Sequence, residues 1–215
     1  GLTKGQYSPT SEYGKKTKST PYGSVDYPLN PMSLALGSEA TFVARTYDTD
    51  VKHMSEVLQA AGKHRGAAFV EIYQNCVIFN DKAFSAVDDK AVRENHSLKL
   101  SEGRPLIFGK EGNKGIRLRG LEPEVLEFDP KKPPADLLIH SPRQLGSTYA
   151  EFLARMAPPR FPIPMGVFRA VERPTYDRLV NDQVEAAMAA QGPGDLEQLW
   201  NSGDTWTVEA GGEIQ

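Results

Sequence analysis

The chain has 215 residues, with 25 Lys and Arg against 28 Asp and Glu, a formal net charge of −3 and a single cysteine. The negative charge argues against nucleic acid as the dominant partner, because binding to phosphates requires a surplus of basic side chains. The lone Cys76 excludes an intramolecular disulfide and a metal site made only of this chain's thiolates. The apolar runs are far shorter than the about 20 residues that span a bilayer, so we expect no membrane segment.

The first 30 residues predict an ordered loop. The starting sequence GLTKGQ has no apolar stretch or cleavage-site pattern, so we expect no secretory signal and, with one thiol, a cytoplasmic location. It also lacks an initiator Met, and we therefore expect the chain to begin after a processing or truncation step. Residues 1–30 show no helical or strand period, yet they carry four tyrosines, which disordered segments rarely do. The pattern favours a loop that faces a ligand.

Residues 31–75 have the pattern of a short helix followed by a strand–helix–strand unit. Asn30 before Pro31 is a helix-start signal, and the helix should run to about Gly37. A strand, an amphipathic helix and a second strand in succession predict a right-handed crossover in a parallel sheet. The elements of this unit are expected at 40–45 (strand), from a cap at Asp48 or Asp50 to Ala61 (helix) and at 67–72 (strand).

The sequence changes character after Asp81, where short apolar segments alternate with Gly and charged residues. Four of these segments predict a small antiparallel meander. We therefore divide the chain into residues 1–81, the back half of an α/β domain, and residues 82–215, a β-rich and helical extension with a tail after Gly192. Beyond Asp81, strands are expected at 98–100, 105–108, 115–118, 125–128 and 165–169, and helices at 146–156 and 174–191.

Two segments could carry chemistry. Gly1–Gln6 places two glycines and a Thr around a Lys at the mouth of the predicted sheet, where backbone amides can cradle phosphate, although such runs are also common in surface loops. Cys76 directly follows the second predicted strand. It could be a core filler, a nucleophile or one ligand of a shared cluster, and the absence of a neighbouring His weakens the nucleophile interpretation.

Together, GLTKGQYSPTSEYGKKTKSTPYGSVDYPLNP and EIYQNCVIFND resemble the β subunit of the 2-oxoacid:ferredoxin oxidoreductases, in particular the 2-oxoglutarate branch. The resemblance is strong over residues 1–81 and continues more weakly to about Asp177. It implies an α/β fold: the C-terminal part of a thiamine-diphosphate-binding domain, with a parallel sheet and flanking helices, plus a small β-rich extension with helices. It also implies oxidative decarboxylation of 2-oxoglutarate to succinyl-CoA and CO2, with thiamine diphosphate, Mg²⁺ and a [4Fe-4S] cluster as cofactors and ferredoxin as electron acceptor.

The resemblance also implies roles for particular residues. Gly1, Leu2 and Thr3 match positions that face the cofactor. Lys4 matches the lysine that attracts the distal carboxylate of 2-oxoglutarate, and Leu2 would line the pocket beside it. Cys76 matches the fourth cluster ligand. The family's Mg²⁺ ligands and other cysteines precede the position of Gly1, so the resemblance implies the C-terminal portion of a subunit.

The implied partners are the missing N-terminal portion, an α subunit, ferredoxin, 2-oxoglutarate and coenzyme A. One alternative is a catalytically incompetent fragment that acts only as an interaction module. Another is a preference for pyruvate or a broad range of 2-oxo acids, which would remove the requirement for Lys4. The run of Lys15, Lys16 and Lys18 could contact an acidic partner or phosphate, or it could be a solvated face.

Overall fold

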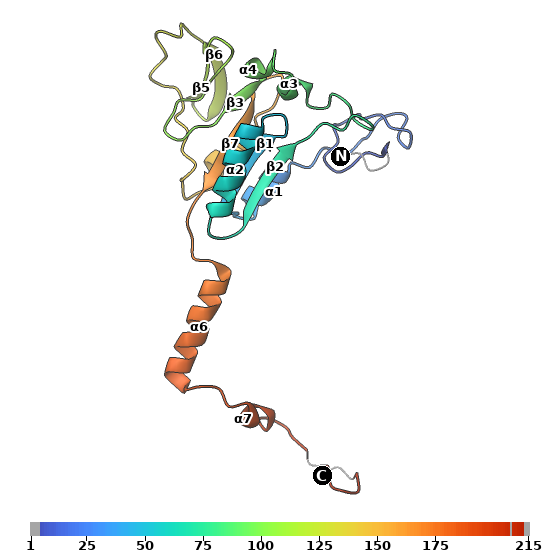
Figure 1. Ribbon diagram of the computed structural model, residues 1–215, viewed down its shortest axis with the longest axis vertical. Helices are drawn as coiled ribbons and strands as arrows, with labels where there is room; N and C mark the ends of the chain where they lie inside the picture. Colours follow the sequence, from blue (N-terminus) through green and yellow to red (C-terminus); the bar gives the residue numbers. More distant parts are fainter. Residues whose placement is uncertain (1–4, 207, 213–215) are drawn as a thin grey trace. The chain divides into compact units, whose positions relative to one another are not determined.

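The computed structural model describes residues 5–206 and 208–212, except for the side chain of Asp88 (Figure 1). The chain divides into two compact units, Gly1–Arg173 and Pro174–Gln215. The division predicted at Asp81 rests on the change in sequence character, and it stays a prediction. Among the described residues, every helix is too short or too polar to cross a bilayer.

The larger unit is built on a four-stranded mixed sheet in the order β2-β1-β7-β3. Strands β1 (Phe42–Tyr47) and β2 (Ala68–Tyr73) are parallel and are joined by helix α2 (Val51–Lys63), which confirms the predicted crossover. Strand β7 (Ile163–Ala170) runs antiparallel to β1 on its other side. This return of a distant segment makes β1 a central strand, and all six of its residues are buried.

A second sheet of three antiparallel strands consists of β4 (Ile107–Phe108), β5 (Lys114–Arg119) and β6 (Glu122–Glu127). Strand β3 (Ser97–Lys99) was predicted as the first strand of this meander, and that assignment is wrong. β3 instead pairs in parallel with β7 in the larger sheet, with Leu98 opposite Pro164. Because the two segments are more than 60 residues apart in sequence, no local pattern reports their pairing.

Helix α1 (Pro31–Gly37) has the predicted bounds, since Asn30 Oδ1 accepts the Ser33 amide at 3.1 Å and Pro31 occupies the first turn. Asp50 caps α2, accepting the His53 amide at 3.0 Å. The remaining helices of the larger unit are α3 (Ser85–Asp88), α4 (Arg93–His96) and α5 (Thr148–Ala154).

The helices cover opposite faces of the sheet (Figure 1). On one face, Phe42 and Ala44 of β1 pack with Val57 of α2. On the other face, Val43 and Phe168 belong to the main core, together with apolar side chains of α1 and α5. The alternation along β1 therefore buries both sides of the strand, as expected for a sheet between two helical layers. This architecture confirms the predicted α/β fold with a parallel strand pair, flanking helices and a β-rich part.

The second unit contains helices α6 (Tyr176–Gln191) and α7 (Leu196–Trp200). Helix α6 matches the predicted long helix to within two residues at its start. Helix α7 was not predicted, although Asp195 is a good N-cap and accepts the Gln198 amide at 3.0 Å. None of the described residues of this unit is buried.

Candidate functional site

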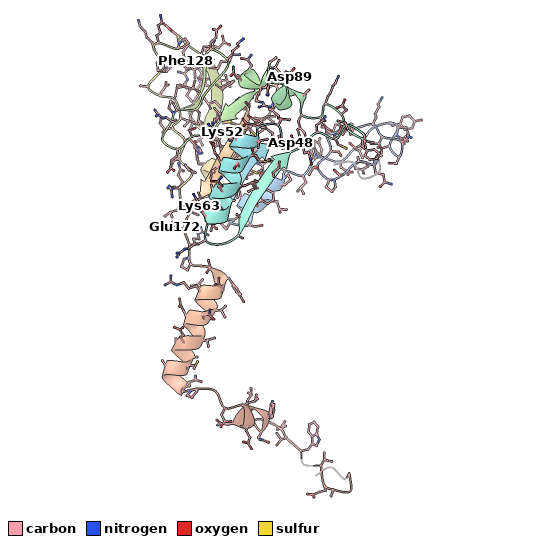
Figure 2. The ribbon with its side chains drawn as sticks, in the orientation of Figure 1. Asp48, Lys52, Lys63, Asp89, Phe128 and Glu172 are labelled. Carbon is pink, nitrogen blue, oxygen red and sulfur yellow. The ribbon has the colours of Figure 1, made fainter. Side chains whose placement is uncertain are left out.

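Cys76 lies in a tight turn at the carboxyl edge of the parallel strands. Strands β1 and β2 end side by side, and the Asp48 amide donates to Tyr73 O at 3.0 Å. Asp48 marks this edge in Figure 2, whereas Lys63 ends α2 at the opposite edge. Loops that leave the carboxyl ends of parallel strands commonly bind ligands. The turn that carries Cys76 therefore occupies the position in the fold where a ligand is expected.

The backbone of the turn influences the ionisation of Cys76. The turn closes when the Asn80 amide donates to Cys76 O at 2.9 Å. Hydrogen bonds from backbone amides, that of Phe79 first and those of Ile78 and Asn80 to a smaller extent, lower the pKa of the Cys76 thiol below its ordinary value, while partial burial opposes this shift. Donors of this kind stabilise the thiolate, which is the form that binds metals.

The core-filler interpretation of Cys76 does not agree with this geometry. The residue is half-buried and belongs to none of the three hydrophobic clusters of the larger unit. The side chains that follow it are exposed, with 74% of Val77, 78% of Ile78 and 45% of Phe79 accessible to solvent. The turn thus exposes three apolar side chains to solvent, while the thiol of Cys76 is half-buried next to them.

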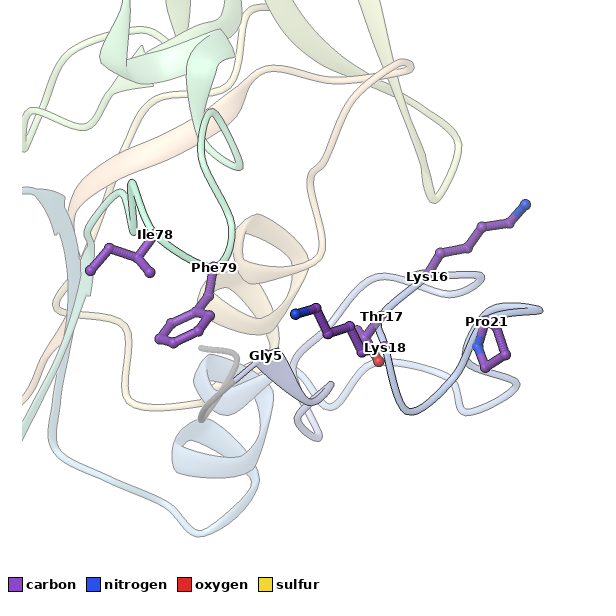
Figure 3. Close-up of a pocket in the computed structure, with 7 residues that line it drawn as sticks. All are labelled: Gly5, Lys16, Thr17, Lys18, Pro21, Ile78 and Phe79. Carbon is purple, nitrogen blue, oxygen red and sulfur yellow. The ribbon is translucent and has the colours of Figure 1, made fainter.

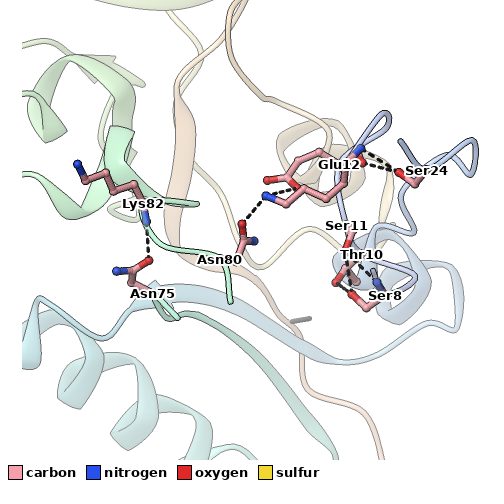
Figure 4. Close-up of polar contacts among 9 residues, drawn as sticks. Ser8, Thr10, Ser11, Glu12, Ser24, Asn75, Asn80 and Lys82 are labelled. Atoms are coloured by element: carbon pink, nitrogen blue, oxygen red, sulfur yellow. Dashed lines mark hydrogen bonds and ion pairs between the residues drawn. The ribbon is translucent and has the colours of Figure 1, made fainter. Parts of the chain in front are cut away.

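Two polar residues fix the ends of the turn. Asn75 Nδ2 donates to Asp81 Oδ1 at 2.9 Å. Asn75 Oδ1 accepts the Lys82 amide at 2.9 Å (Figure 4). The sequence patterns predict no role for Asn75, Asn80 or Asp81. Asn and Asp side chains favour such local bonds to the backbone. Their positions on both sides of Cys76 in the sequence were therefore the signal from which a tight turn could have been predicted.

Residues 5–30 form an ordered loop, as predicted. The Gly14 amide donates to Ser24 O at 2.8 Å, and the Ser24 amide returns a bond of 3.0 Å to Lys15 O. The side chains of Ser11 and Ser24 are buried inside the loop. That the loop faces a ligand stays a prediction.

The loop meets the Cys76 turn at two points. A Cβ at Gly5 would lie 3.6 Å from the Phe79 ring, and φ is +80° there, a backbone conformation that favours Gly. The Lys15 ammonium also donates to Asn80 Oδ1 (Figure 4). Residues 5–30 and the turn that carries Cys76 are therefore neighbours, although Lys15 and Asn80 are 65 positions apart in sequence.

A hollow of about 580 Å³ lies between the loop and the turn (Figure 3). The Lys18 side chain extends toward Phe79, and Lys16 extends away from it. The lining residues are Gly5, Lys16, Thr17, Lys18, Pro21, Ile78 and Phe79.

The other predicted site residues, Gly1, Leu2, Thr3 and Lys4, lie outside the described residues, so their roles stay predictions. Within 5–206 and 208–212, no three His, Cys, Asp or Glu side chains are grouped so that they could bind a metal ion. Cys76 is the chain's only cysteine, and any cluster of thiolates that includes it needs ligands from elsewhere.

Comparisons with known proteins agree on one family. Residues 1–72 match the domain described as thiamine pyrophosphate enzyme, C-terminal TPP binding domain. The chain is 45% identical over 217 residues to the 2-oxoglutarate oxidoreductase subunit KorB of Mycobacterium tuberculosis, covering 97% of this chain and 56% of that protein. It is 47% identical over 92 residues to the 2-oxoacid:ferredoxin oxidoreductase subunit beta of Saccharolobus solfataricus, covering 43% of this chain and 30% of that protein. The chain spans about half the length, or less, of these curated relatives.

The fold also has a counterpart among solved structures. A 2-oxoglutarate:ferredoxin oxidoreductase from Magnetococcus marinus, with 2-oxoglutarate, coenzyme A and succinyl-CoA bound, matches with a TM-score of 0.60 and 23% identity. The match covers 93% of this chain and 53% of that chain. At this level of identity, the likeness supports the fold.

Proposed function

We propose that this chain, which belongs to the β subunits of the 2-oxoacid:ferredoxin oxidoreductases, is the C-terminal portion of a subunit that oxidises 2-oxoglutarate. The reaction converts 2-oxoglutarate and coenzyme A into succinyl-CoA, CO2, a proton and two electrons, which pass singly to ferredoxin. The observation that carries the proposal is the Cys76 turn: a thiol with amide donors at the carboxyl edge of the parallel strands, beside the loop of residues 5–30.

Thiamine diphosphate supplies the electron sink for decarboxylation in this reaction. The part of this chain is to position the reactants. Gly1, Leu2 and Thr3 would contact the cofactor, while Leu2 and Lys4 would contact the substrate. A buried distal carboxylate needs a cationic partner, and Lys4 supplies one. The ligands of Mg²⁺ would come from the portion of the subunit that precedes Gly1.

Cys76 fits one position of a [4Fe-4S] cluster, which takes four thiolate ligands. Amide donors to the sulfur are among the features that tune the potential of such clusters. The other three ligands would come from the preceding portion, since the chain has one cysteine. The partners in the proposal are that portion, an α subunit, ferredoxin and coenzyme A. A cytoplasmic location is part of the proposal, because free thiols stay reduced there.

The test is an anaerobic assay of the full complex with 2-oxoglutarate, coenzyme A and a viologen dye. We expect dye reduction that depends on both substrates, and no reduction with any 2-oxo acid would refute the enzyme assignment.

Replacing Lys4 by Ala should raise the KM for 2-oxoglutarate and change the KM for pyruvate little, because pyruvate has no distal carboxylate. An unchanged KM for 2-oxoglutarate would instead favour the pyruvate or broad-range alternative.

A further inference from the structure

The hollow between the loop and the Cys76 turn is basic on one side and apolar on the other. Lys16 and Lys18 on the loop are exposed, and neither has an ion-pair partner among the described residues. The opposite wall is apolar and consists of Ile78 and Phe79 of the turn. A protein-binding surface commonly has an apolar centre beside a polar or charged rim. The proposed function leaves this surface without a role.

The charge that remains on the loop is positive. Glu12 lies 3.7 Å from the Lys15 ammonium, and Asp26 accepts the Tyr7 hydroxyl at 2.6 Å. These acidic groups are already engaged within the loop. Lys16 and Lys18 are therefore available to an acidic partner, and such charges steer a partner toward its site and fix its orientation.

Lys16 and Lys18, which we call the basic rim, belong to a loop that is held against the Cys76 turn. The Lys15 ammonium donates to Asn80 Oδ1 (Figure 4), and Gly5 and Phe79 line the same hollow (Figure 3). The Gly14 amide donates to Ser24 O and closes the loop. A surface ordered before binding loses less conformational entropy when a partner docks. The basic rim and the apolar turn can thus act as a single preformed surface.

We propose that Lys16, Lys18 and the exposed turn at Ile78 and Phe79 form the docking surface for an acidic one-electron carrier protein. The inference rests on the proposed function, in which Cys76 binds a cluster. Electron transfer weakens steeply with distance, and this surface includes the turn that carries Cys76. Each oxidised carrier would accept one electron and leave reduced, so two carriers dock in turn for each 2-oxoglutarate. Transient redox contacts of this kind are small, commonly below about 1,200 Å².

The test uses the full complex carrying Lys16→Glu with Lys18→Glu. The matched control is Lys131→Glu with Lys132→Glu, two exposed lysines that follow β6, on the side of the larger unit away from residues 5–30 in Figure 1. Binding of an acidic ferredoxin is measured by calorimetry at low and high salt. The KM for ferredoxin is measured in the presence of 2-oxoglutarate and coenzyme A. The rate of viologen reduction measures 2-oxoglutarate oxidation without a docked protein.

We expect the Lys16/Lys18 variant to raise the Kd and KM for ferredoxin roughly tenfold at low salt, with a smaller effect at high salt. Viologen reduction should be unchanged, and the control should bind ferredoxin like the parent complex. An Ile78→Ser variant should weaken ferredoxin binding equally at both salt concentrations, because its contact is apolar.

Three results would overturn the inference. The first is a ferredoxin affinity that changes no more than in the control. The second is loss of viologen reduction or dissociation of the complex in the Lys16/Lys18 variant, which would make the surface a subunit contact. The third is a parent complex that reduces neither dye nor ferredoxin, and in that case the proposed function fails as well. If the complex reduces the dye but ferredoxin binding does not depend on Lys16 and Lys18, the proposed docking surface is wrong and the proposed function still holds.

Discussion

A buried ion pair joins the two parallel strands next to the candidate site. Arg45 of β1 lies opposite Glu71 of β2, and its Nε is 2.6 Å from Glu71 Oε2. The side chains are only 4% and 18% exposed, respectively. The Arg45 guanidinium also lies 5.2 Å from the centre of the Tyr73 ring and 5.3 Å from that of Phe168. The pair therefore links both strands to the core.

Replacing Glu71 by Gln keeps the shape of the side chain and removes its charge. The Arg45 guanidinium then stays buried without a counter-ion. Breaking such a pair costs about 3–5 kcal/mol, and the partial exposure of Glu71 places the expected loss near the lower end, at about 3 kcal/mol. Replacing both residues, Arg45→Met with Glu71→Leu, removes the charge problem and should restore most of the lost stability.

Chemical denaturation of the two variants and the parent protein measures these differences, with each midpoint converted through its slope. We expect a large shift for Glu71→Gln and a small one for the double variant. If the double variant is as unstable as the single one, the stacking of Arg45 on the two rings, and not the ion pair, stabilises this region.

Two further predictions concern packing and pH. In Gly115→Ala, the new Cβ would lie 2.6 Å from Leu137 Cδ2 and 2.9 Å from Phe128 Cε1, so we expect a loss of about 1–3 kcal/mol from overpacking; an unchanged melting temperature would show that these side chains move freely. Burial lowers the pKa of His140, whose Nε2 lies 2.9 Å from Val167 O, below the ordinary 6.5. The unfolded chain therefore binds the proton first, and stability should fall as the pH drops through about 6.5. The denaturation midpoint of His140→Gln should fall less between about pH 7 and pH 5 than that of the parent, and equal slopes would contradict this reasoning.

Local signals were enough to predict much of the fold. Asn30 before Pro31 located α1, and the apolar face that contains Val57 located α2 between two strands. The partners of β3 and β7 could not be predicted, because their pairing depends on contacts between distant segments. Helix α7 was missed because five residues are too few to show a helical period.

The candidate site was predicted in part. Cys76 was located as the chemical group that follows the second strand, and the resemblance supplied its role as a cluster ligand, which stays a proposal. The amide donors to its sulfur and the Lys15–Asn80 contact were missed, because they depend on the path of the turn and on a contact between residues 65 positions apart. Leu2 and Lys4 lie outside the described residues, so the substrate contacts stay predictions.

Spectroscopy of the full complex tests most directly whether Cys76 is a ligand of an electron-transfer cluster. Iron content and the electron paramagnetic resonance spectrum of the dithionite-reduced complex should be compared for the parent, Cys76→Ser and Val77→Ser. Val77 is 74% exposed in the same turn, so its replacement controls for local disturbance. We expect Val77→Ser to keep the signal of a reduced cluster and Cys76→Ser to lose iron and that signal. A complete, redox-active cluster in Cys76→Ser would contradict the assignment.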